Sequence, residues 1–505
     1  MLRGRYLTGS LAALLLIVVA APSAHAQTAT LSLEDAITLA LRNNPDYLQQ
    51  ANDAGLADWA VRSAYGALLP MASASTSYSY TAEGGQRIGN FTGSELGLAT
   101  ATDYHSTSYG LNVNMRVSGS SLFAPRQAQS QRRATVANIE AAGFTLRTTV
   151  TRQYLAVKRA RDGVVLAQQE LARSDENLRL AQARVDVGAA IPLEAQQAQI
   201  ERGRAEVSLL QAENLVQTER LRLSQQLGVE LPAGTELTTP FAVRPVPWTL
   251  AELQAMATAA HPQLSAARAA EEVADAGVRM ARSAYLPSLN LSAGVLNGFA
   301  RRAGNSDYLV QQQRSSAISQ MQSCDLLNRI SAGLSSPLPD TPADCSAFIP
   351  TPDQEQRIRD ANRFNFSNDP FSASISVSLP IFDGFARERQ VEQARVARAD
   401  AELRLRSEQT RINTEIATAL NTAETGRRSA ELEARNVELA EQQLLLARER
   451  YRLGLASYVE LQEAETLKAR ADRAYLSAIY QFHENLAALE AAVGRSLTQG
   501  METGS

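Results

Sequence analysis

The sequence predicts a mainly α-helical fold with a small β portion, in which two similar halves each contribute a long coiled-coil helical hairpin. Three observations lead to this prediction. Motif positions recur at fixed spacings along the 505 residues, and apolar residues repeat every seven positions over long helical stretches. In addition, four segments of about ten residues alternate between apolar and polar side chains.

The duplication rests on two sets of matched positions. Leu33, Pro45, Leu69 and Pro70 recur 217 positions later as Leu250, Pro262, Leu286 and Pro287. Gly188, Glu194, Gln196, Ala198 and Gly228 recur 266 positions later as Gly454, Glu460, Gln462, Ala464 and Gly494. Because the offset grows by 49 residues, the second half carries an insertion. We expect a first repeat over 27–265, an equatorial linker over 229–249, a second repeat over 250–495 and a flexible tail over 496–505.

Residues 1–26 have the features of a secretory signal peptide. Arg3 and Arg5 give a basic start, Leu11 to Ala21 form an apolar stretch, and small residues end the segment at Ala26. A membrane anchor is the alternative, but the apolar stretch is too short to span a bilayer comfortably. No later stretch approaches the ~20 apolar residues of a membrane helix. We therefore expect an exported chain that is either soluble in the periplasm or crosses an outer membrane as β-strands.

Charge and cysteine content narrow the possibilities further. The net charge of −4 is close to balance, which argues against nucleic acid as a partner. Cys324 and Cys345 are the only cysteines, and in an exported chain we expect them to form a disulfide. Closing the loop between them would contribute about 3 kcal/mol. Two free thiols are the alternative.

Four segments are predicted to be strands, at 70–82, 105–118, 287–297 and 370–381. Each alternates an apolar face with a face rich in serine and asparagine, which is typical of outer-membrane barrels. A soluble sandwich with one buried face is the alternative. A long polar loop, 298–369, is expected between the last two strands. It holds the insertion and both cysteines, and we expect it to be an extracellular cap or decoration.

Helices are predicted at 33–67, 124–187 and 193–227, and again at 250–285, 387–453 and 459–493. Residues spaced by seven mark the long helices, which predicts left-handed coiled-coil packing. A second such stripe on the later helix predicts neighbours on both sides, as in a closed ring, whereas a simple hairpin needs only one stripe. The stripes are Val164, Leu171, Leu178 and Val185; Ala430, Val437, Leu444 and Tyr451; and Leu432, Leu439, Leu446 and Leu453.

Four strands cannot close a barrel, because an open edge in lipid leaves unpaired backbone groups. Three copies would give a 12-stranded barrel with a wide lumen, above an α-helical tunnel of twelve staves. Two copies would give eight strands and an interior filled by side chains. The predicted fold is therefore a trimeric assembly to which each chain contributes four strands.

The sequence offers no candidate for catalysis. The four histidines, at 25, 105, 261 and 483, have no metal-ligand spacing, and no nucleotide-binding or nucleophile motif is present. We expect no enzyme activity, no cofactor and no metal. A chain without a nucleotide motif cannot energise transport itself, so a separate pump is expected.

Several motifs, in order and duplicated, resemble the TolC-type outer-membrane channel family over about residues 30–495. They are Leu33-Glu34-Asp35-Ala36 before Asn44-Pro45, the Leu-Pro strand entries, Leu379-Pro380-Ile381-Phe382-Asp383-Gly384, and the run from Tyr451 to Leu461. The resemblance implies a homotrimer whose barrel lies in the outer-membrane lipid of a Gram-negative bacterium and whose tunnel reaches through the periplasm. It also implies two partners, a periplasmic adaptor (membrane fusion) protein and an inner-membrane pump.

The resemblance also assigns roles to residues. Gly188 and Gly454, with Leu455, would mark the periplasmic tips of the two hairpins, where the adaptor docks. Glu460 and Glu463 would ring the tunnel mouth, and Tyr451 would contact Glu194 in the closed state. The family commonly has an arginine two residues after the second tip glycine, where this chain has Ala456, so the closed gate is expected to be weaker or differently latched.

The resulting functional hypothesis is a passive exit duct for small molecules or drugs in a tripartite efflux system. One-step (type I) protein secretion is the alternative within the same class. A non-transporting periplasmic or surface coiled-coil scaffold is the alternative from a different class.

Overall fold

The structure is a computed structural model that describes residues 30–82, 87–88, 90–92, 102–232, 234–334, 336, 344–364 and 366–497. The predicted signal peptide lies outside the described residues, as does the predicted tail from residue 498 onwards. The chain divides into two compact units. The first, here called the helical unit, comprises Met1–Asp53, Val136–Ala266 and Leu405–Ser505, and the second, the sheet unit, comprises Ala54–Thr135 and Ala267–Arg404.

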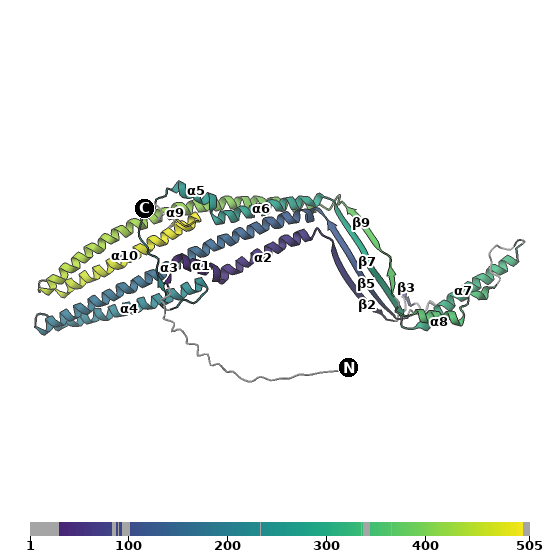
Figure 1. The fold of residues 1–505 in the computed structure, drawn as a ribbon, viewed down its shortest axis with the longest axis horizontal. Helices are drawn as coiled ribbons and strands as arrows, with labels where there is room; N and C mark the ends of the chain where they lie inside the picture. Colours follow the sequence, from purple (N-terminus) through teal and green to yellow (C-terminus); the bar gives the residue numbers. More distant parts are fainter. Residues whose placement is uncertain are drawn as a thin grey trace, which may run out of the picture. The chain divides into compact units, whose positions relative to one another are not determined.

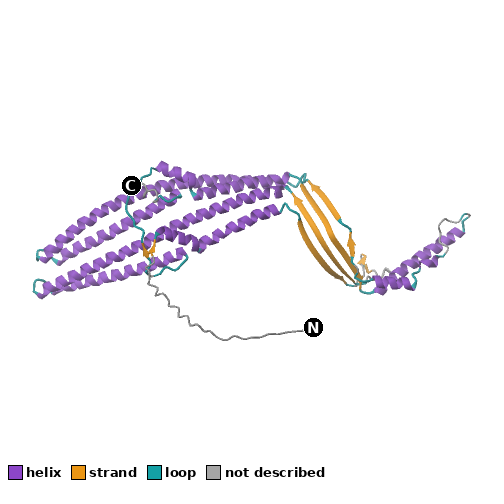
Figure 2. Cartoon of the chain, in the orientation of Figure 1, coloured by secondary structure: helices purple, strands orange, loops and turns teal. Residues whose placement is uncertain are grey.

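Long helices dominate the chain, as the apolar periodicity predicts (Figures 1 and 2). Helix α3 (Gly119–Asp186) turns back into α4 (Pro192–Leu227), and α9 (Ala386–Arg452) turns back into α10 (Tyr458–Val493). None of the helices in the described part of the chain combines the length and the apolar composition that crossing a membrane requires.

Helix α3 begins five residues before the predicted start at 124. Ser118 caps it, because its Oγ accepts a hydrogen bond from the Ser121 backbone N–H at 3.2 Å. Pro125 lies inside the helix without ending it. The missing N–H of Pro125 therefore costs one helical hydrogen bond in a helix of 68 residues.

The predictions of single helices at 33–67 and 250–285 are wrong, because each segment breaks before a proline. The first forms α1 (Leu33–Asn43) and α2 (Pro45–Gly66), and the second forms α5 (Leu250–Ala260), α6 (Pro262–Arg282) and a 3-10 turn at Ser283–Tyr285. Asn44 and His261 precede the prolines and are extended, with ψ of 119° and 123°. The proline ring disfavours the helical conformation of the preceding residue, which explains both breaks.

The helical unit contains two apolar clusters at equivalent places in the two repeats. Leu146, Val150, Leu223 and Leu227 pack with α1, and Ile412, Ile416, Leu489 and Val493, each 266 positions later, pack with α5. Gly228 and Gly494 end α4 and α10 with positive φ of 72° and 82°. A Cβ at Gly228 would lie 2.2 Å from the Asn43 carbonyl oxygen, so glycine permits the close approach to the break after α1. A short parallel pair, β1 (Thr30–Leu31) with β6 (Glu236–Leu237), ties the start of the described chain to the linker.

The sheet unit contains an antiparallel sheet in the order β2, β5, β7, with β8 and β9 both pairing with β7 (Figure 2). Its strands are β2 (Met71–Thr81), β5 (Tyr104–Val117), β7 (Ser288–Ala303), β8 (Ser367–Asp369) and β9 (Ser372–Ser378). The predicted strand at 370–381 is shorter in the structure, because Pro370 and Pro380 lack the backbone N–H that a ladder needs. The strand predicted to end at 297 instead continues to Ala303, so the insertion begins later than expected. A two-residue pair, β3 (Arg87–Ile88) with β4 (Phe91–Thr92), lies in the first inter-strand loop.

The register separates an apolar face of the sheet from a polar face. Val113 pairs with Ala72 on one side and Ala293 on the other, and Leu291 pairs with Met115 and Ile375. On the opposite face Ser292 pairs with Asn114 and Ser374, and Asn290 pairs with Arg116 and Ser376. Between Leu111 and Asn112 the register shifts, so Val295 is an extra residue in β7 and Leu296 continues the apolar face. The predicted alternation of β7 therefore holds only as far as Gly294.

The insertion is largely helical, whereas a long loop was expected. It contains α7 (Ser306–Ala332), a 3-10 turn at Cys345–Phe348 and α8 (Pro352–Ala361), which begins with a capping box between Thr351 and Gln354. Cys324 and Cys345 form a disulfide between α7 and the turn. Asn362 donates to the Ala303 carbonyl at 2.9 Å and accepts from the Ala303 N–H at 2.8 Å, which fixes the end of α8 to the end of β7.

Candidate functional site

The two turns between the long helices have the same backbone geometry. After α3, the N–H of Gly188 donates to the Val185 carbonyl at 2.9 Å and the N–H of Ala189 to the Arg184 carbonyl at 2.8 Å. After α9, Gly454 and Leu455 donate in the same way to Tyr451 and Arg450. Both glycines have positive φ, 72° and 75°. Each turn is thus a Schellman motif, which requires a residue in the left-handed conformation at the glycine position.

Tyr451 brings the two turns into contact. Its hydroxyl donates a 2.9 Å hydrogen bond to Oε2 of Glu194, which lies in the first turn of α4. The Arg184 guanidinium lies 4.2 Å from the centre of the Tyr451 ring and donates to the Tyr451 carbonyl. The structure therefore brings together Tyr451 and Glu194, as the sequence predicted, and adds Arg184.

The duplicated turns make different contacts because one position differs between them. Arg184 and Glu194 correspond to Arg450 and Glu460 at the offset of 266, and Arg450 forms an ion pair with Glu460 within the second hairpin. The position equivalent to Tyr451 is Val185. Since valine offers no hydroxyl, the acid and the arginine of the first hairpin both contact Tyr451 of the second hairpin instead.

The tyrosines at this contact stay protonated at neutral pH. Tyr451 is fully buried, and its pKa is raised above the usual 10. Burial is the larger cause, and the hydrogen bond to the Glu194 carboxylate is the second. Tyr458, whose ring centre lies 5.9 Å from that of Tyr451, has its pKa raised to about 12 by burial and by nearby carboxylates. The Tyr451 hydroxyl therefore keeps its proton at neutral pH and donates it in the hydrogen bond to Glu194.

Glu460 and Glu463 differ in their surroundings. The N–H of Glu460 donates to the Ser457 Oγ at 3.2 Å, which caps α10, and its carboxylate is paired with Arg450. Glu463 is exposed, and within the described residues it forms no ion pair. Glu463 is thus the freer carboxylate of the two that the sequence singled out. Ala456, at the position where an arginine was expected, packs partly buried against the cluster around Tyr451.

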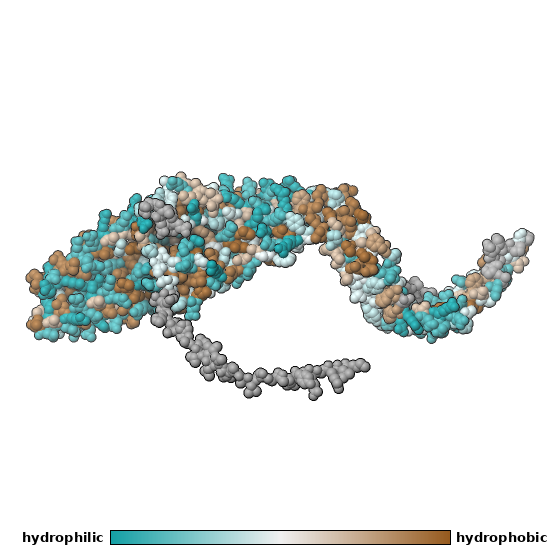
Figure 3. All heavy atoms as spheres, viewed as in Figure 1, coloured by the Kyte–Doolittle hydropathy of each residue, from teal (hydrophilic) through white to brown (hydrophobic). Residues whose placement is uncertain are grey.

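Exposed apolar side chains cover both tips (Figure 3). Leu455, which the resemblance marked as a tip residue, is 68% exposed. Two further pairs were missed by the sequence interpretation although each is related by the offset of 266, which is the signal that could have found them. They are Val187 with Leu453, and Leu193 with Val459. The turns therefore present matching apolar surfaces at 188–194 and 454–460.

No group of three or more histidine, cysteine or acidic side chains in the described part of the chain is arranged to hold a metal ion. The site consists of contacts between helices and of exposed tips.

Comparison with known proteins gives one family. Residues 36–229 and 352–495 match the model of the family described as outer membrane efflux protein. Between them, the matched ranges leave out 230–351, which hold most of the linker, helices α5, α6 and α7, and one strand of the sheet, β7. The outer membrane efflux protein BepC of Brucella suis is 29% identical over 205 residues, which are 39% of this chain and 43% of that protein. The chain thus matches less than half of the length of this curated relative.

Solved structures share the fold over nearly the whole chain. The CmeC outer membrane channel of Campylobacter jejuni superposes with a TM-score of 0.67 at 16% identity, covering 93% of this chain and 88% of that one. The MtrE outer membrane channel of Neisseria gonorrhoeae, in its open state, superposes with a TM-score of 0.64 at 20% identity, covering 92% and 89%.

Proposed function

Because the chain belongs to the outer membrane efflux protein family, we propose that it is a passive exit duct in the outer membrane, through which a tripartite system expels small molecules. In this proposal residues 1–26 direct export and are removed, and two repeats joined by the 229–249 linker form the mature protomer. A homotrimer forms the duct, and its long helices extend into the periplasm. A periplasmic adaptor and an inner-membrane pump supply substrate and energy.

The two faces of the sheet support a position in lipid. Ile375, Val377 and Leu296 on the apolar face are 72%, 69% and 63% exposed in the single chain. Apolar side chains at this density would be costly in water and favourable against acyl chains. The serine and asparagine face would then line the lumen, where it can hydrogen-bond water. This separation of faces is the observation that carries the proposal.

The strands at the ends of the sheet support assembly from several copies. β2 pairs only with β5, and β9 pairs only with β7, so each leaves one edge of its backbone unpaired within the described chain. In lipid each unpaired group would cost several kcal/mol. Pairing β2 of one copy with β9 of the next satisfies both edges. Three copies give 12 strands when β8 and β9, which both pair with β7, are counted as one strand.

Exposed stripes on the helices support the same assembly. On α9 the stripe Ala430, Leu444 and Tyr451 is buried within the chain. The second α9 stripe is exposed, and so are residues spaced by seven or fourteen on α4. They are Leu432, Leu439, Leu446 and Leu453 on α9, and Leu193, Ile200, Val207 and Leu221 on α4. Heptad stripes of this kind pack as knobs into holes, so we assign them to the seams between neighbouring copies.

The tips support docking and closure. In this proposal the apolar turns around Gly188 and Gly454 bind the adaptor, with Leu455 as one anchor. Tyr451 and Glu194 hold the two hairpins together in the closed state, and Glu463 with Glu460 forms a ring of carboxylates at the mouth of the trimer. A carboxylate ring favours cations at a constriction.

The test is to purify the mature protein from the outer-membrane fraction in detergent and measure its mass and its current in planar lipid bilayers. The proposal expects a trimer that conducts, and Glu463→Gln should weaken block by divalent cations more than Glu460→Gln, whose parent carboxylate is paired. A monomer that stays in solution without detergent and carries no current would contradict the proposal.

A further inference from the structure

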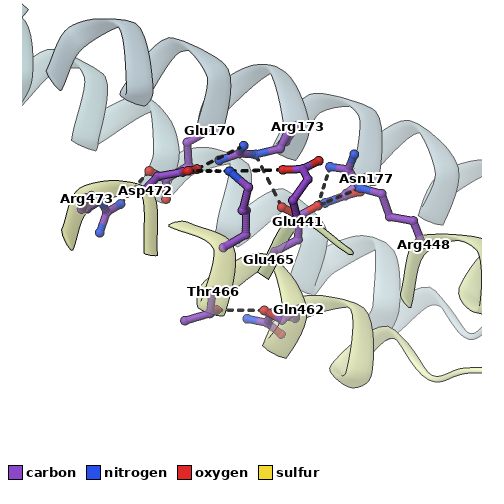
Figure 4. A network of polar contacts seen from close by, with 11 residues as sticks. Glu170, Arg173, Asn177, Glu441, Arg448, Gln462, Glu465, Thr466, Asp472 and Arg473 are labelled. Carbon is purple, nitrogen blue, oxygen red and sulfur yellow. Dashed lines mark hydrogen bonds and ion pairs between the residues drawn. The ribbon is translucent and has the colours of Figure 1, made fainter. Parts of the chain in front are cut away.

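Eight charged side chains form a network where α3 lies against α9 and α10, closer to the middle of the hairpins than the tip contact (Figure 4). The network is connected by ion pairs and lies entirely within the helical unit. Its members are Glu170 and Arg173 on α3, Glu441 and Arg448 on α9, and Glu465, Lys468, Asp472 and Arg473 on α10.

The network is electrically balanced as a whole and also on each side of the boundary between the two repeats. The α9–α10 hairpin supplies three carboxylates and three cations, and α3 supplies one of each. Several of these groups are well buried, since the side chains of Lys468 and Asp472 are only 8% and 10% exposed. A buried charge without a partner is costly, so this division decides which separations the structure tolerates.

The contacts within the α9–α10 hairpin are short. Arg448 forms a 2.6 Å ion pair with Glu465, and Lys468 lies 3.2 Å from Glu441 and donates a hydrogen bond to Asp472. Each of the three carboxylates on this side thus has a cation from its own hairpin. The hairpin would keep these pairs if α3 moved away.

The contacts across the boundary are of two kinds. Arg173 lies between Glu465 and Asp472, at 3.6 and 3.7 Å, beyond hydrogen-bonding distance. Its Nε and the Asp472 Oδ2 are buried without a hydrogen-bond partner in the described chain. Two shorter contacts also cross the boundary, from Asn177 to Glu465 at 3.0 Å and from Arg473 to Glu170 at 2.6 Å. Arg173 is therefore held mainly by charge, which tolerates a change in distance better than a hydrogen bond does.

We propose that this network is a parting seam, at which α3 separates from an intact α9–α10 hairpin, and that Arg173 is the positioning residue that returns α3 to it. The inference rests on the proposed duct, because the parting would accompany its opening. After separation each side still holds equal numbers of carboxylates and cations, so neither side of the seam is left with a net charge. What holds the seam shut is therefore the balance of charge brought by Glu170 and Arg173 together.

If charge balance holds the seam shut, a single variant and a double variant should differ in an unusual direction. Arg173→Gln leaves Glu170, which pairs with Arg473, as the one charge that α3 brings to the network, so the closed seam carries a net −1. The double variant Glu170→Gln with Arg173→Gln restores neutrality although it removes more ion pairs. If contacts simply added, the double variant would part at least as readily as the single one. Under charge balance the double variant parts less readily, and the interaction between the two substitutions is measurable in a double-mutant cycle.

Parting can be measured without relying on current. Ala181 on α3 is completely buried in a cluster with Leu444, Tyr451 and Leu461 of the other hairpin. Ala181→Cys would place there the only free thiol, since both native cysteines are in the disulfide. Its rate of reaction with a charged maleimide, on the full chain in detergent, reports how often α3 moves away. Thermal unfolding of each variant, followed in parallel, identifies any variant that fails to fold.

We expect Arg173→Gln to raise the labelling rate by about tenfold, and the double variant to stay within about twofold of the parent. Arg159→Gln is the matched control, because Arg159 forms a 3.1 Å ion pair with Glu484 between the same two helices but outside the network. It should change the rate less than Arg173→Gln does. A double variant that labels as fast as Arg173→Gln, or faster, would overturn the seam, and so would an equal effect of Arg159→Gln.

Planar-bilayer currents of the same variants separate this inference from the proposed function. If the labelling pattern appears but no variant conducts, the seam stands and the duct fails. If the parent conducts but Arg173→Gln leaves labelling unchanged, the duct stands and the seam fails.

Discussion

The hydroxyl of Tyr451 offers the most direct test of the closed contact between the hairpins. Tyr451→Phe keeps the buried ring and its packing against Arg184 and Tyr458, and removes only the hydrogen bond to Glu194. A hydrogen bond to a charged group contributes about 1.5–3 kcal/mol when both partners are dry. Glu194 is only partly buried, so water can replace the lost donor and the lower end of that range applies. Since 1.4 kcal/mol is a factor of ten, we expect the closed-to-open ratio to fall by about tenfold for each protomer.

The assay is the fraction of time that purified protein conducts in planar lipid bilayers, with thermal unfolding measured alongside. Tyr458→Phe is the matched control, because it removes the hydroxyl of a neighbouring buried tyrosine whose oxygen makes no hydrogen bond within the described residues. The gate assignment requires Tyr451→Phe to raise the open fraction and Tyr458→Phe to leave it nearly unchanged. An unchanged open fraction in Tyr451→Phe, or equal increases in both variants, would refute the reasoning.

Three further predictions follow from the sheet, the glycines and a buried histidine. Ile375→Arg, on the apolar face, should destabilise insertion into lipid by ~2–4 kcal/mol, whereas Ser376→Arg, on the opposite face, should insert normally and alter ion selectivity. Insertion is measured by folding each variant into lipid vesicles. Equal insertion defects in the two variants would contradict the assigned faces. Gly454→Ala and Gly494→Ala both force alanine into a positive φ at a cost of roughly 1–2 kcal/mol. A Cβ at Gly494 would also lie 2.9 Å from the Cα of His261, whereas a Cβ at Gly454 would meet no described heavy atom within 4 Å. Gly494→Ala should therefore have the lower melting temperature of the two variants. Burial lowers the pKa of His483 to about 4 from 6.5, so the folded state resists protonation and stability should fall as the pH drops below 6.5. At pH 5 the loss from this group is about 2 kcal/mol, and His483→Gln should flatten the pH dependence of the melting temperature between pH 7 and 5, whereas an unchanged slope would contradict the assignment.

Much of the fold follows from periodicity. The resemblance to TolC-type channels is confirmed by the family match, and the mainly helical fold by the structure. The sequence interpretation treated Asn44-Pro45 and His261-Pro262 as helix interior, because it assigned a single helix to each of the segments 33–67 and 250–285. The local rule that the residue before proline avoids the helical region predicts both breaks, and here it overrides periodicity.

The insertion could not be predicted from the same signals. Its helix α7 has polar residues on much of its surface, and its buried positions Val310, Ala317, Cys324 and Ser331 are mostly small. A stripe of small residues gives a weak helical pattern by sequence alone. The disulfide to Cys345 positions α7 instead, and the Asn362 contacts with Ala303 position α8; both depend on residues distant in the sequence.

The tip shows what duplication alone cannot predict. The equivalences of Glu194 with Glu460 and of Gly188 with Gly454 were evident, but they imply two similar hairpins. The contacts differ because Tyr451 stands where the first repeat has Val185. Comparing matched positions identifies the residues that agree, whereas the contact between the hairpins arises from a position that differs.

This asymmetry has a consequence for the proposed trimer. If all six hairpins were equivalent, each would have to move alike for the mouth to widen. Here the second hairpin has ion pairs of its own, through Arg450 with Glu460 at the tip and Arg448 with Glu465 higher up. The first hairpin places Arg184, Glu194 and Arg173 against residues of the second. Opening at the boundary between the repeats would therefore leave the internal pairs of the second hairpin intact. The double variant Val185→Tyr with Tyr451→Val moves the tyrosine from the second hairpin to the first. The new tyrosine hydroxyl could then donate to Glu460, but only if Glu460 gives up its ion pair with Arg450. Because that exchange breaks an existing ion pair, we expect the swapped chain to close less well than the parent, and equal closure in bilayer recordings would show that the asymmetry has no functional weight.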